Sequence, residues 1–179
     1  MRTAAELVAQ VLADAGVRRV FGISGDSVLA LIDAIDRTPG IDYMPVRHEQ
    51  VGASMADGYA RVTGNPGAVL AHMGPGVCNL VIGLASAYRD SSPVIALTGV
   101  REQHKRGRDS WHEIDQLALL RPITKWAVRI TSADSAPRIM RSALVRALSG
   151  RPGPVHIELP KDIALKESCA DAGEPLLFS

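Results

Sequence analysis

The sequence predicts an α/β domain built on a doubly wound, six-stranded, mainly parallel sheet with helices on both faces. Along most of the 179 residues, segments with the apolar spacing of helices alternate with short runs of apolar residues. Such alternation is typical of parallel sheets, in which a helix connects each strand to the next. The short runs are apolar on consecutive positions, as expected for strands that are buried on both faces.

The first helix is expected over residues 3–15. Thr3 and Glu6 have the spacing of a capping box, in which each side chain accepts a hydrogen bond from the backbone N–H of the other residue. Apolar residues recur at helical spacing from Leu7 onward, and Gly16 is a typical stop signal.

The alternation continues to the last predicted strand. Strands are expected over 17–23, 43–46, 68–72, 94–98, 126–130 and 155–159. Further helices are expected over 28–35, 49–62, 113–120 and 135–148, together with one that follows a turn at 74–76 and ends at residue 88. The chain after Pro160 has no periodicity, so we expect a domain over 3–163 and a linker or tail over 164–179.

The composition excludes several classes of protein. Twenty Lys and Arg against 19 Asp and Glu give a net charge of +1, which favours neither nucleic acid nor a membrane surface as a partner. Residues 62–88 carry no charge but include polar and helix-breaking positions, so they are not a membrane span. Cys78 and Cys169 lie far apart without zinc-type spacing, and no apolar signal peptide opens the chain. We therefore expect a cytoplasmic protein with reduced thiols and no metal site of its own.

In a parallel sheet of this kind, ligands bind at the carboxyl ends of the strands. The loops at that edge are 23–27, 46–49, 72–79 and 98–110. Glu49 stands in one of them, at the start of a helix whose early residues are small or apolar, so its carboxylate is expected to be poorly solvated. The alternative is that Glu49 only complements the helix dipole, which is worth about 0.3 to 1 kcal/mol.

The helix that Glu49 opens is rich in small residues, among them Gly52, Ala53 and Gly58. Such a face permits the close approach of another backbone. Gly58 lies in the middle of the helix, where glycine costs roughly 1 kcal/mol unless packing makes use of it.

Two other loops carry candidate binding residues. Gly74, Pro75 and Gly76, followed by Asn79, form a turn that presents backbone amides and a carboxamide, although an ordinary turn between strand and helix has the same composition. The basic loop 101–108 is either a solvated loop or a site where Arg or Lys recognises an anionic group. The chain has no P-loop, and Gly22 and Gly25 lack the third glycine of the dinucleotide fingerprint, so a nucleotide-binding oxidoreductase is disfavoured.

Five motifs, in this order, resemble the acetohydroxyacid (acetolactate) synthase and pyruvate oxidase group of thiamine diphosphate enzymes. They are FGISGD at 21–26, RHEQ at 47–50, ADGYAR at 56–61, GPG at 74–76 with Asn79, and RPGPV at 151–155. The resemblance covers residues 3–163 and corresponds to the N-terminal pyrimidine-binding (PYR) domain of these enzymes. Their diphosphate-binding domain is marked by Gly-Asp-Gly and a later Asn-Asn, and this sequence has neither.

The resemblance implies roles for individual residues. Glu49 is the catalytic residue, because its carboxyl would hydrogen-bond N1′ of the cofactor's aminopyrimidine and favour the tautomer that removes the thiazolium C2 proton. Gly25 and Asp26 would edge the pyrimidine, and Pro75 and Asn79 would hold its other side. The cofactors implied are thiamine diphosphate and Mg²⁺, the metal being held by a domain that this sequence does not contain.

The resemblance also implies a reaction class, the decarboxylation and carboligation of 2-oxo acids, in a chain that is a fragment or one subunit of a split enzyme. Activity would require a diphosphate-binding domain or subunit, and the small-residue face suggests a homo-oligomer. Trp111 and His112 stand where the group usually has Phe-Gln near the substrate, which leaves the substrate open. The chain also has Ser24-Gly25 in place of Pro-Gly and Val100 in place of Gln. The alternative is a non-catalytic binding or assembly domain in which Glu49 only caps its helix.

Overall fold

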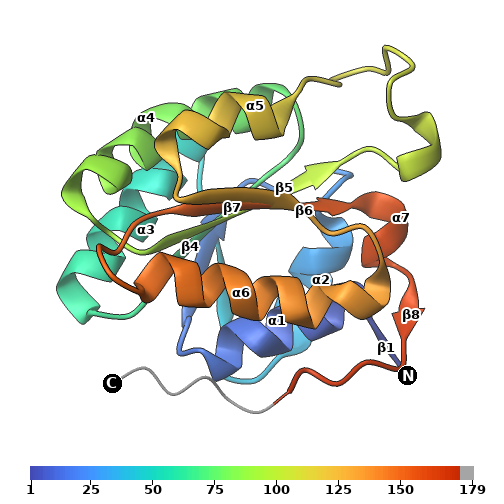
Figure 1. Ribbon diagram of the computed structural model, residues 1–179, viewed down its shortest axis with the longest axis horizontal. Helices are drawn as coiled ribbons and strands as arrows, with labels where there is room; N and C mark the ends of the chain where they lie inside the picture. The colour runs from blue at the N-terminus through green and yellow to red at the C-terminus, as the bar shows by residue number, and fades with distance from the viewer. Residues whose placement is uncertain (174–179) are drawn as a thin grey trace.

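The computed structural model describes residues 1–173 and confirms the predicted fold class (Figure 1). Its main sheet has six strands in the order β3-β2-β4-β5-β7-β6, and every neighbouring pair is parallel. The strands are β2 (Arg19–Gly22), β3 (Asp42–Pro45), β4 (Gly67–Ala71), β5 (Val94–Val100), β6 (Trp126–Arg129) and β7 (Val155–Pro160).

Helices cover both faces of this sheet (Figure 1). One face carries α1 (Ala4–Asp14), α2 (Leu29–Arg37) and α6 (Ala136–Leu148), and the other carries α3 (Glu49–Thr63), α4 (Pro75–Asp90) and α5 (Gln116–Leu120). Neighbouring residues of a strand point to opposite faces, so Leu70 packs in the first layer and Val69 in the second. Both side chains are fully buried, as expected for a strand with helices on each side.

The capping box at the first helix is confirmed. Thr3 Oγ1 accepts a hydrogen bond from the Glu6 backbone N–H at 3.2 Å, and Glu6 Oε2 accepts one from the Thr3 N–H at 2.8 Å. An N-cap of this kind stabilises a helix by about 1 kcal/mol. Gly16 follows the helix with a left-handed φ of +85°, which glycine adopts without strain.

The strand order places a topological switch beside β2. The chain goes from β2 to β3 on one side and then returns to β4 on the other side. The loops that follow β2 and β4 therefore leave the sheet at a crevice between their carboxyl ends, where ligands bind in doubly wound folds. This edge holds the predicted site residues of loops 23–27 and 72–79.

The region between β5 and β6 differs from the prediction. The helix expected from residue 113 begins at Gln116, because the Glu113 carboxylate is used in the preceding loop, where it accepts hydrogen bonds from the backbone N–H of Gly107 (2.6 Å) and Ser110 (3.0 Å). Asp115 then caps α5 by accepting from the Ala118 N–H at 3.0 Å. Three short 3-10 helices complete the connections: η1 (Gln103–Lys105), η2 (Arg121–Ile123) and η3 (Ala133–Ser135).

Beyond Pro160, the structure contains two short elements that the sequence pattern did not predict. A short helix, α7 (Lys161–Ala164), follows, and β8 (Glu167–Ser168) pairs antiparallel with β1 (Arg2–Thr3) at the other end of the chain. These elements are too short to produce a periodic pattern, and their stability comes from Ile163 and Ala164, which are buried in the layer of α1, α2 and α6. Residues 174–179 of the predicted tail lie outside the described residues.

Among residues 1–173, the helices are all too short or too polar to cross a membrane.

Candidate functional site

Glu49 is the first residue of α3 and follows the N-cap His48, whose Nδ1 accepts a hydrogen bond from the Gln50 N–H at 3.2 Å. The Glu49 side chain is nearly buried, with 8% of its residue surface exposed. This confirms the expectation that its carboxylate is poorly solvated. A carboxylate that only complements the helix dipole can stay in water, whereas a nearly buried carboxylate needs hydrogen-bond partners.

Asn79 of α4 holds one oxygen of this carboxylate. Its Nδ2 donates a hydrogen bond to Glu49 Oε2 at 2.9 Å. The other oxygen, Oε1, accepts no hydrogen bond from any residue that the structure describes. Gly76 lies beside it, and a Cβ atom at that position would come within 3.0 Å of Oε1. The hydrogen bond from Asn79 to Oε2 therefore orients the carboxylate, while Oε1 has no partner among the described residues and lies beside the position of the missing Gly76 side chain.

Helices α3 and α4 bring these residues together because their surfaces meet without intervening side chains. A Cβ atom at Gly83 would lie 2.5 Å from Ala53 Cβ and 3.0 Å from the Ser54 backbone nitrogen. The close approach expected at the small residues of α3 is thus made, in part, inside this chain. Gly58 is different, since nothing lies within 4 Å of the position of its missing Cβ.

The turn before α4 also depends on glycine. Gly74 has a left-handed φ of +68°, and a Cβ atom there would lie 2.5 Å from the backbone oxygen of His112. Its N–H donates to Gln116 Oε1 at 2.9 Å. Pro75 follows as the first residue of α4, where a missing N–H costs nothing, and is exposed to solvent.

A second group of residues surrounds His72, just after β4. The Ser27 hydroxyl lies 2.8 Å from His72 Nδ1, and Gly25 packs so closely on the ring that a Cβ would come within 2.7 Å of its Cγ. The His112 ring meets the His72 ring edge-on at 5.7 Å, and Trp111 stacks on His112 at 3.5 Å with 69% of its surface exposed. Burial, together with the electrostatic influence of the neighbouring His112 and of Arg101, lowers the pKa of His72.

His72 was not assigned a role from the sequence. Within residues 62–88 it is the only histidine, and this stretch contains no acidic or basic residue of another kind. His72 also stands at the end of a predicted strand, and this position at the carboxyl edge of the sheet is the feature of the sequence that could have indicated a binding role.

Asp26 is drawn toward α7. Its carboxylate pairs with Lys161 Nζ at 2.6 Å, and both side chains are partly open to solvent. Of the predicted site residues, the structure therefore joins Glu49, Asn79 and the 74–76 turn directly. Asp26 instead contacts Lys161.

A buried polar network lies behind the Gly74 turn. The Gln116 carboxamide, 1% exposed, donates through Nε2 to the Gly99 backbone oxygen (3.2 Å) and to Glu158 Oε1 (3.1 Å). Glu158 Oε2 in turn accepts from Arg129 Nε at 2.5 Å, so the ion pair neutralises a fully buried carboxylate. This network ties β5, β6 and β7 to the turn before α4, and nothing in the local sequence of Gln116 indicates it.

His156 on β7 belongs to the same region. Its Nε2 lies 2.8 Å from Thr98 Oγ1, whereas its Nδ1 is buried without a partner among the described residues. Burial, and to a lesser degree the charge of Arg129, lowers the pKa of His156 to about 3. The imidazole is therefore neutral in the folded protein at ordinary pH. No three His, Cys, Asp or Glu side chains within residues 1–173 form a group that could hold a metal ion.

Comparison with known proteins identifies the family. Residues 2–119 match the model of the thiamine pyrophosphate enzyme N-terminal TPP binding domain. The chain belongs to this family. The resemblance drawn from its motifs is thereby confirmed.

The TPP binding domain is similar to acetolactate synthase large subunits. It is 43% identical over 163 residues to the isozyme 3 large subunit of Escherichia coli K12, which covers 91% of this chain and 28% of that protein. It is 45% identical over 159 residues to the probable large subunit of Methanocaldococcus jannaschii, covering 89% of this chain and 27% of the relative. It is 46% identical over 151 residues to acetolactate synthase of Arthrospira platensis, covering 83% of this chain and 26% of the relative. The chain thus spans about 28% of the first of these relatives, so further domains or subunits are implied.

The residues of this TPP binding domain fit a thiamine group at the start of α3. A nearly buried carboxylate with one free oxygen suits a ring nitrogen that carries or shares a proton. The missing side chain of Gly76 leaves room for a planar ring beside that oxygen.

Proposed function

We propose that this domain binds the aminopyrimidine ring of thiamine diphosphate and that Glu49 shares a proton with N1′ of that ring. The observation that carries the proposal is the arrangement of the Glu49 carboxylate, nearly buried, with Oε2 held by Asn79 at 2.9 Å and Oε1 without a partner. A hydrogen bond that is shielded from solvent in this way is stronger than the same bond in water, because the local dielectric constant is lower.

Each neighbouring residue has a part in this proposal. Asn79 orients the carboxylate, and Gly76 leaves space for the ring. Pro75 and Gly25 border the two sides of the ring, with Asp26 at its edge. When bound, thiamine diphosphate supplies a thiazolium carbon that adds to a carbonyl and takes up the electron pair released by decarboxylation.

The names of the relatives support a proposal for the reaction class. Because they are acetolactate synthase large subunits, we propose that the complete enzyme decarboxylates a 2-oxo acid and joins the product to a second carbonyl compound. Trp111 and His112 are proposed to border the substrate. Mg²⁺ and the diphosphate are assigned to a further domain. The present domain is proposed to span 3–163, with residues 164–179 as a linker or tail whose first part packs back on the domain through β8. Free thiols at Cys78 and Cys169 support a cytoplasmic location.

We also propose that two copies associate through the outer faces of α3 and α4. Val51, Met55 and Ile82 are large apolar side chains exposed on these helices, and Gly58 offers a place for close approach. Sedimentation at tens of micromolar, roughly, is expected to give a dimer, and Ile82→Glu is expected to give a monomer with an unchanged far-UV spectrum. A wild-type monomer contradicts this assembly.

The pyrimidine proposal is tested with thiamine, which carries the ring without the diphosphate. In a titration followed by NMR, we expect saturable shifts of backbone amides near residues 49–53 and 74–79. Glu49→Gln is expected to weaken binding about tenfold, since a charge-assisted hydrogen bond is worth roughly 1.5 to 3 kcal/mol. Glu167→Gln, the same chemical change on exposed β8, is the matched control. If Glu49→Gln and the control bind thiamine equally, Glu49 only stabilises the start of its helix, and the alternative of a non-catalytic assembly domain is favoured.

A further inference from the structure

A small cavity lies at the carboxyl ends of β5, β6 and β7. Its volume is about 110 Å³, and Val100 and Pro160, which are paired in register at the strand ends, form its apolar part. Its polar lining, named here the arginine pocket, consists of Arg101, Gln103, Arg106, Arg129 and Thr131. The pocket shares no residue with the Glu49 site.

The arginine pocket lies at the edge of the sheet where parallel folds bind ligands. Three adjacent strands end around it, since β5 pairs with β7 and β7 with β6. Gln103 and Thr131 contact each other in its lining, where Gln103 Nε2 donates to the Thr131 backbone oxygen at 3.3 Å. The carboxyl ends of parallel strands are where ligands bind in open α/β sheets.

The charge of the arginine pocket is positive. All of its ionisable lining residues are arginines, and Arg101 Nε is buried without a hydrogen-bond partner within the described part of the chain. The Arg106 guanidinium forms no ion pair with any described residue, whereas Arg129 is paired with the buried Glu158. About two positive charges therefore remain uncompensated by ion pairs, and one N–H group lacks an acceptor.

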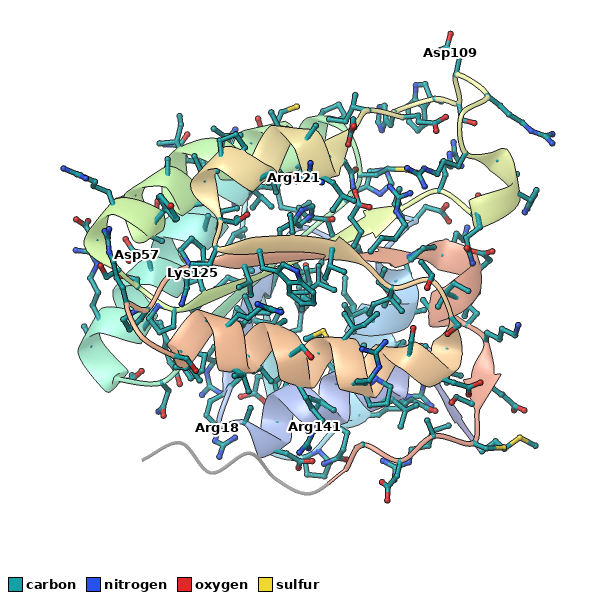
Figure 2. All side chains as sticks on the ribbon, in the orientation of Figure 1. Arg18, Asp57, Asp109, Arg121, Lys125 and Arg141 are labelled. Atoms are coloured by element: carbon teal, nitrogen blue, oxygen red, sulfur yellow. The ribbon has the colours of Figure 1, made fainter. Side chains whose placement is uncertain are left out.

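Acidic residues also lie near the pocket and have other contacts. Glu102 Oε1 pairs with Lys105 at 3.0 Å, while its Oε2 is buried without a hydrogen-bond partner among the described residues; its own backbone N–H, Lys105 and, to a lesser degree, the charge of Arg101 lower the pKa of this carboxyl. Asp162 accepts from the Gln103 backbone N–H at 3.3 Å. A larger cavity of about 380 Å³ adjoins the pocket, sharing Val100 and the three arginines, and includes Glu113 and Asp115, both of which accept from backbone N–H groups. Asp109, also at its rim, projects outward from the tip of the loop (Figure 2).

We propose that the arginine pocket binds a phosphate dianion, either inorganic phosphate or the terminal phosphate of a small metabolite. Planar guanidinium groups match tetrahedral oxyanions with two parallel hydrogen bonds, and two uncompensated charges match a dianion better than a monocarboxylate. An oxygen of the ligand would supply the acceptor that Arg101 Nε lacks. The 110 Å³ volume suits a single phosphate group and excludes a nucleotide from the inner cavity.

The test is a titration of the chain at low ionic strength with three probes: inorganic phosphate, methyl phosphate and pyruvate. Binding is followed by calorimetry and by NMR shifts of backbone amides at 100–106 and 129–131. We expect saturable binding of phosphate that weakens at least about tenfold in Arg101→Gln and in Arg106→Gln, because each removes a charge-assisted hydrogen bond. Arg108→Gln, in the same loop but outside the pocket, is the matched control and is expected to change the affinity less than twofold.

The three probes separate the outcomes. Equal affinity for methyl phosphate and phosphate supports a phosphorylated metabolite, and a preference for phosphate supports the free ion. Pyruvate binding as tightly as phosphate overturns the assignment to a dianion, as does equal weakening by Arg108→Gln or the absence of saturable binding. Thermal unfolding of the variants checks that the fold is retained. Because the Glu49 site is separate, Glu49→Gln is expected to leave phosphate binding unchanged, so the two proposals fail independently.

Discussion

Glu49 and His156 show how burial acts differently on two ionisable side chains of this domain. Glu49 stands at the carboxyl edge of the sheet, where one oxygen is held and the other remains available to a ligand. His156 lies inside the sheet, where the lack of solvent removes its charge and one ring nitrogen has no partner among the described residues. The first arrangement favours binding, and the second affects stability.

Acid is expected to destabilise the protein through His156. Its pKa is about 3 in the folded protein but about 6.5 in an unfolded chain, so protons bind preferentially to the unfolded state between these values. The stabilisation is complete above about pH 6.5 and is lost as the pH falls toward 3, with a slope of up to about 1.4 kcal/mol per pH unit.

Urea unfolding between pH 7 and 4.5 measures this slope. In His156→Leu, the free energy of unfolding is expected to depend less steeply on pH than in wild type. The difference in slope is up to about 1.4 kcal/mol per pH unit, because the leucine side chain does not titrate. Other groups that respond to acid, such as Asp57 with its pKa lowered by Arg61, contribute equally to both proteins. Identical slopes in the two proteins contradict the account.

At the residue scale, the sequence indicated which residues meet where a motif combines with a position at the strand ends. Glu49 and Asn79 were predicted to belong to one site, and the structure places them 2.9 Å apart. Gln116 and His156 were not predicted, because their partners lie 17 to 58 residues away and polar residues in short apolar runs give no local signal.

At the scale of elements, two glycines in neighbouring helices are expected to respond in opposite directions to the same change. Gly83 of α4 meets Ala53 and the α3 backbone, so Gly83→Ala forces the helices apart and costs about 1 to 3 kcal/mol. Gly58 of α3 has free space around it, so Gly58→Ala increases stability by up to about 1 kcal/mol. The free energy of unfolding in urea measures both.

The pair of glycine variants also tests the proposed dimer. If a second copy uses the space at Gly58, then Gly58→Ala stabilises the fold while it weakens association in sedimentation. A stabilising effect of Gly83→Ala would show that the packing of α3 on α4 is looser than the structure gives.

The elements of the fold were largely predictable because their signals are local. Apolar periodicity and caps predicted the six strands and the major helices to within a few residues. The short α7 and β8 were missed, since their formation depends on contacts with α1, α2 and β1, which lie at the opposite end of the sequence. The later start of α5 also depends on a loop contact of Glu113.

At the scale of the whole molecule, the domain supplies one half of a proposed cofactor site. In this proposal, Glu49 is the partner of the pyrimidine ring, whereas a diphosphate with Mg²⁺ normally requires carboxylates that are arranged around the metal. Within residues 1–173, no such cluster exists. The chain also spans about 28% of the E. coli relative, which leaves ample length for a second binding domain in proteins of that size.

The chain alone is therefore expected to bind thiamine diphosphate weakly, with a Kd of about 1 mM or weaker, and with little effect of Mg²⁺. Isothermal titration calorimetry with and without the metal measures this. The same titration in Arg101→Gln removes any contribution of the arginine pocket to diphosphate binding. Micromolar, Mg²⁺-dependent binding by the chain alone contradicts the proposed division between two domains.

The central claim, that Glu49 acts on N1′ of the bound ring, is tested most directly by hydrogen exchange at the thiazolium C2 position. The chain is assembled with a diphosphate-binding domain, and the exchange of the C2 proton is followed by NMR for wild type, Glu49→Gln and the control Glu167→Gln. We predict exchange that is about 10² to 10⁴ times slower in Glu49→Gln, because an amide cannot share a proton as a carboxyl does, and unchanged exchange in the control. Equal exchange rates in wild type and Glu49→Gln, with the cofactor bound equally in both, would contradict the claim.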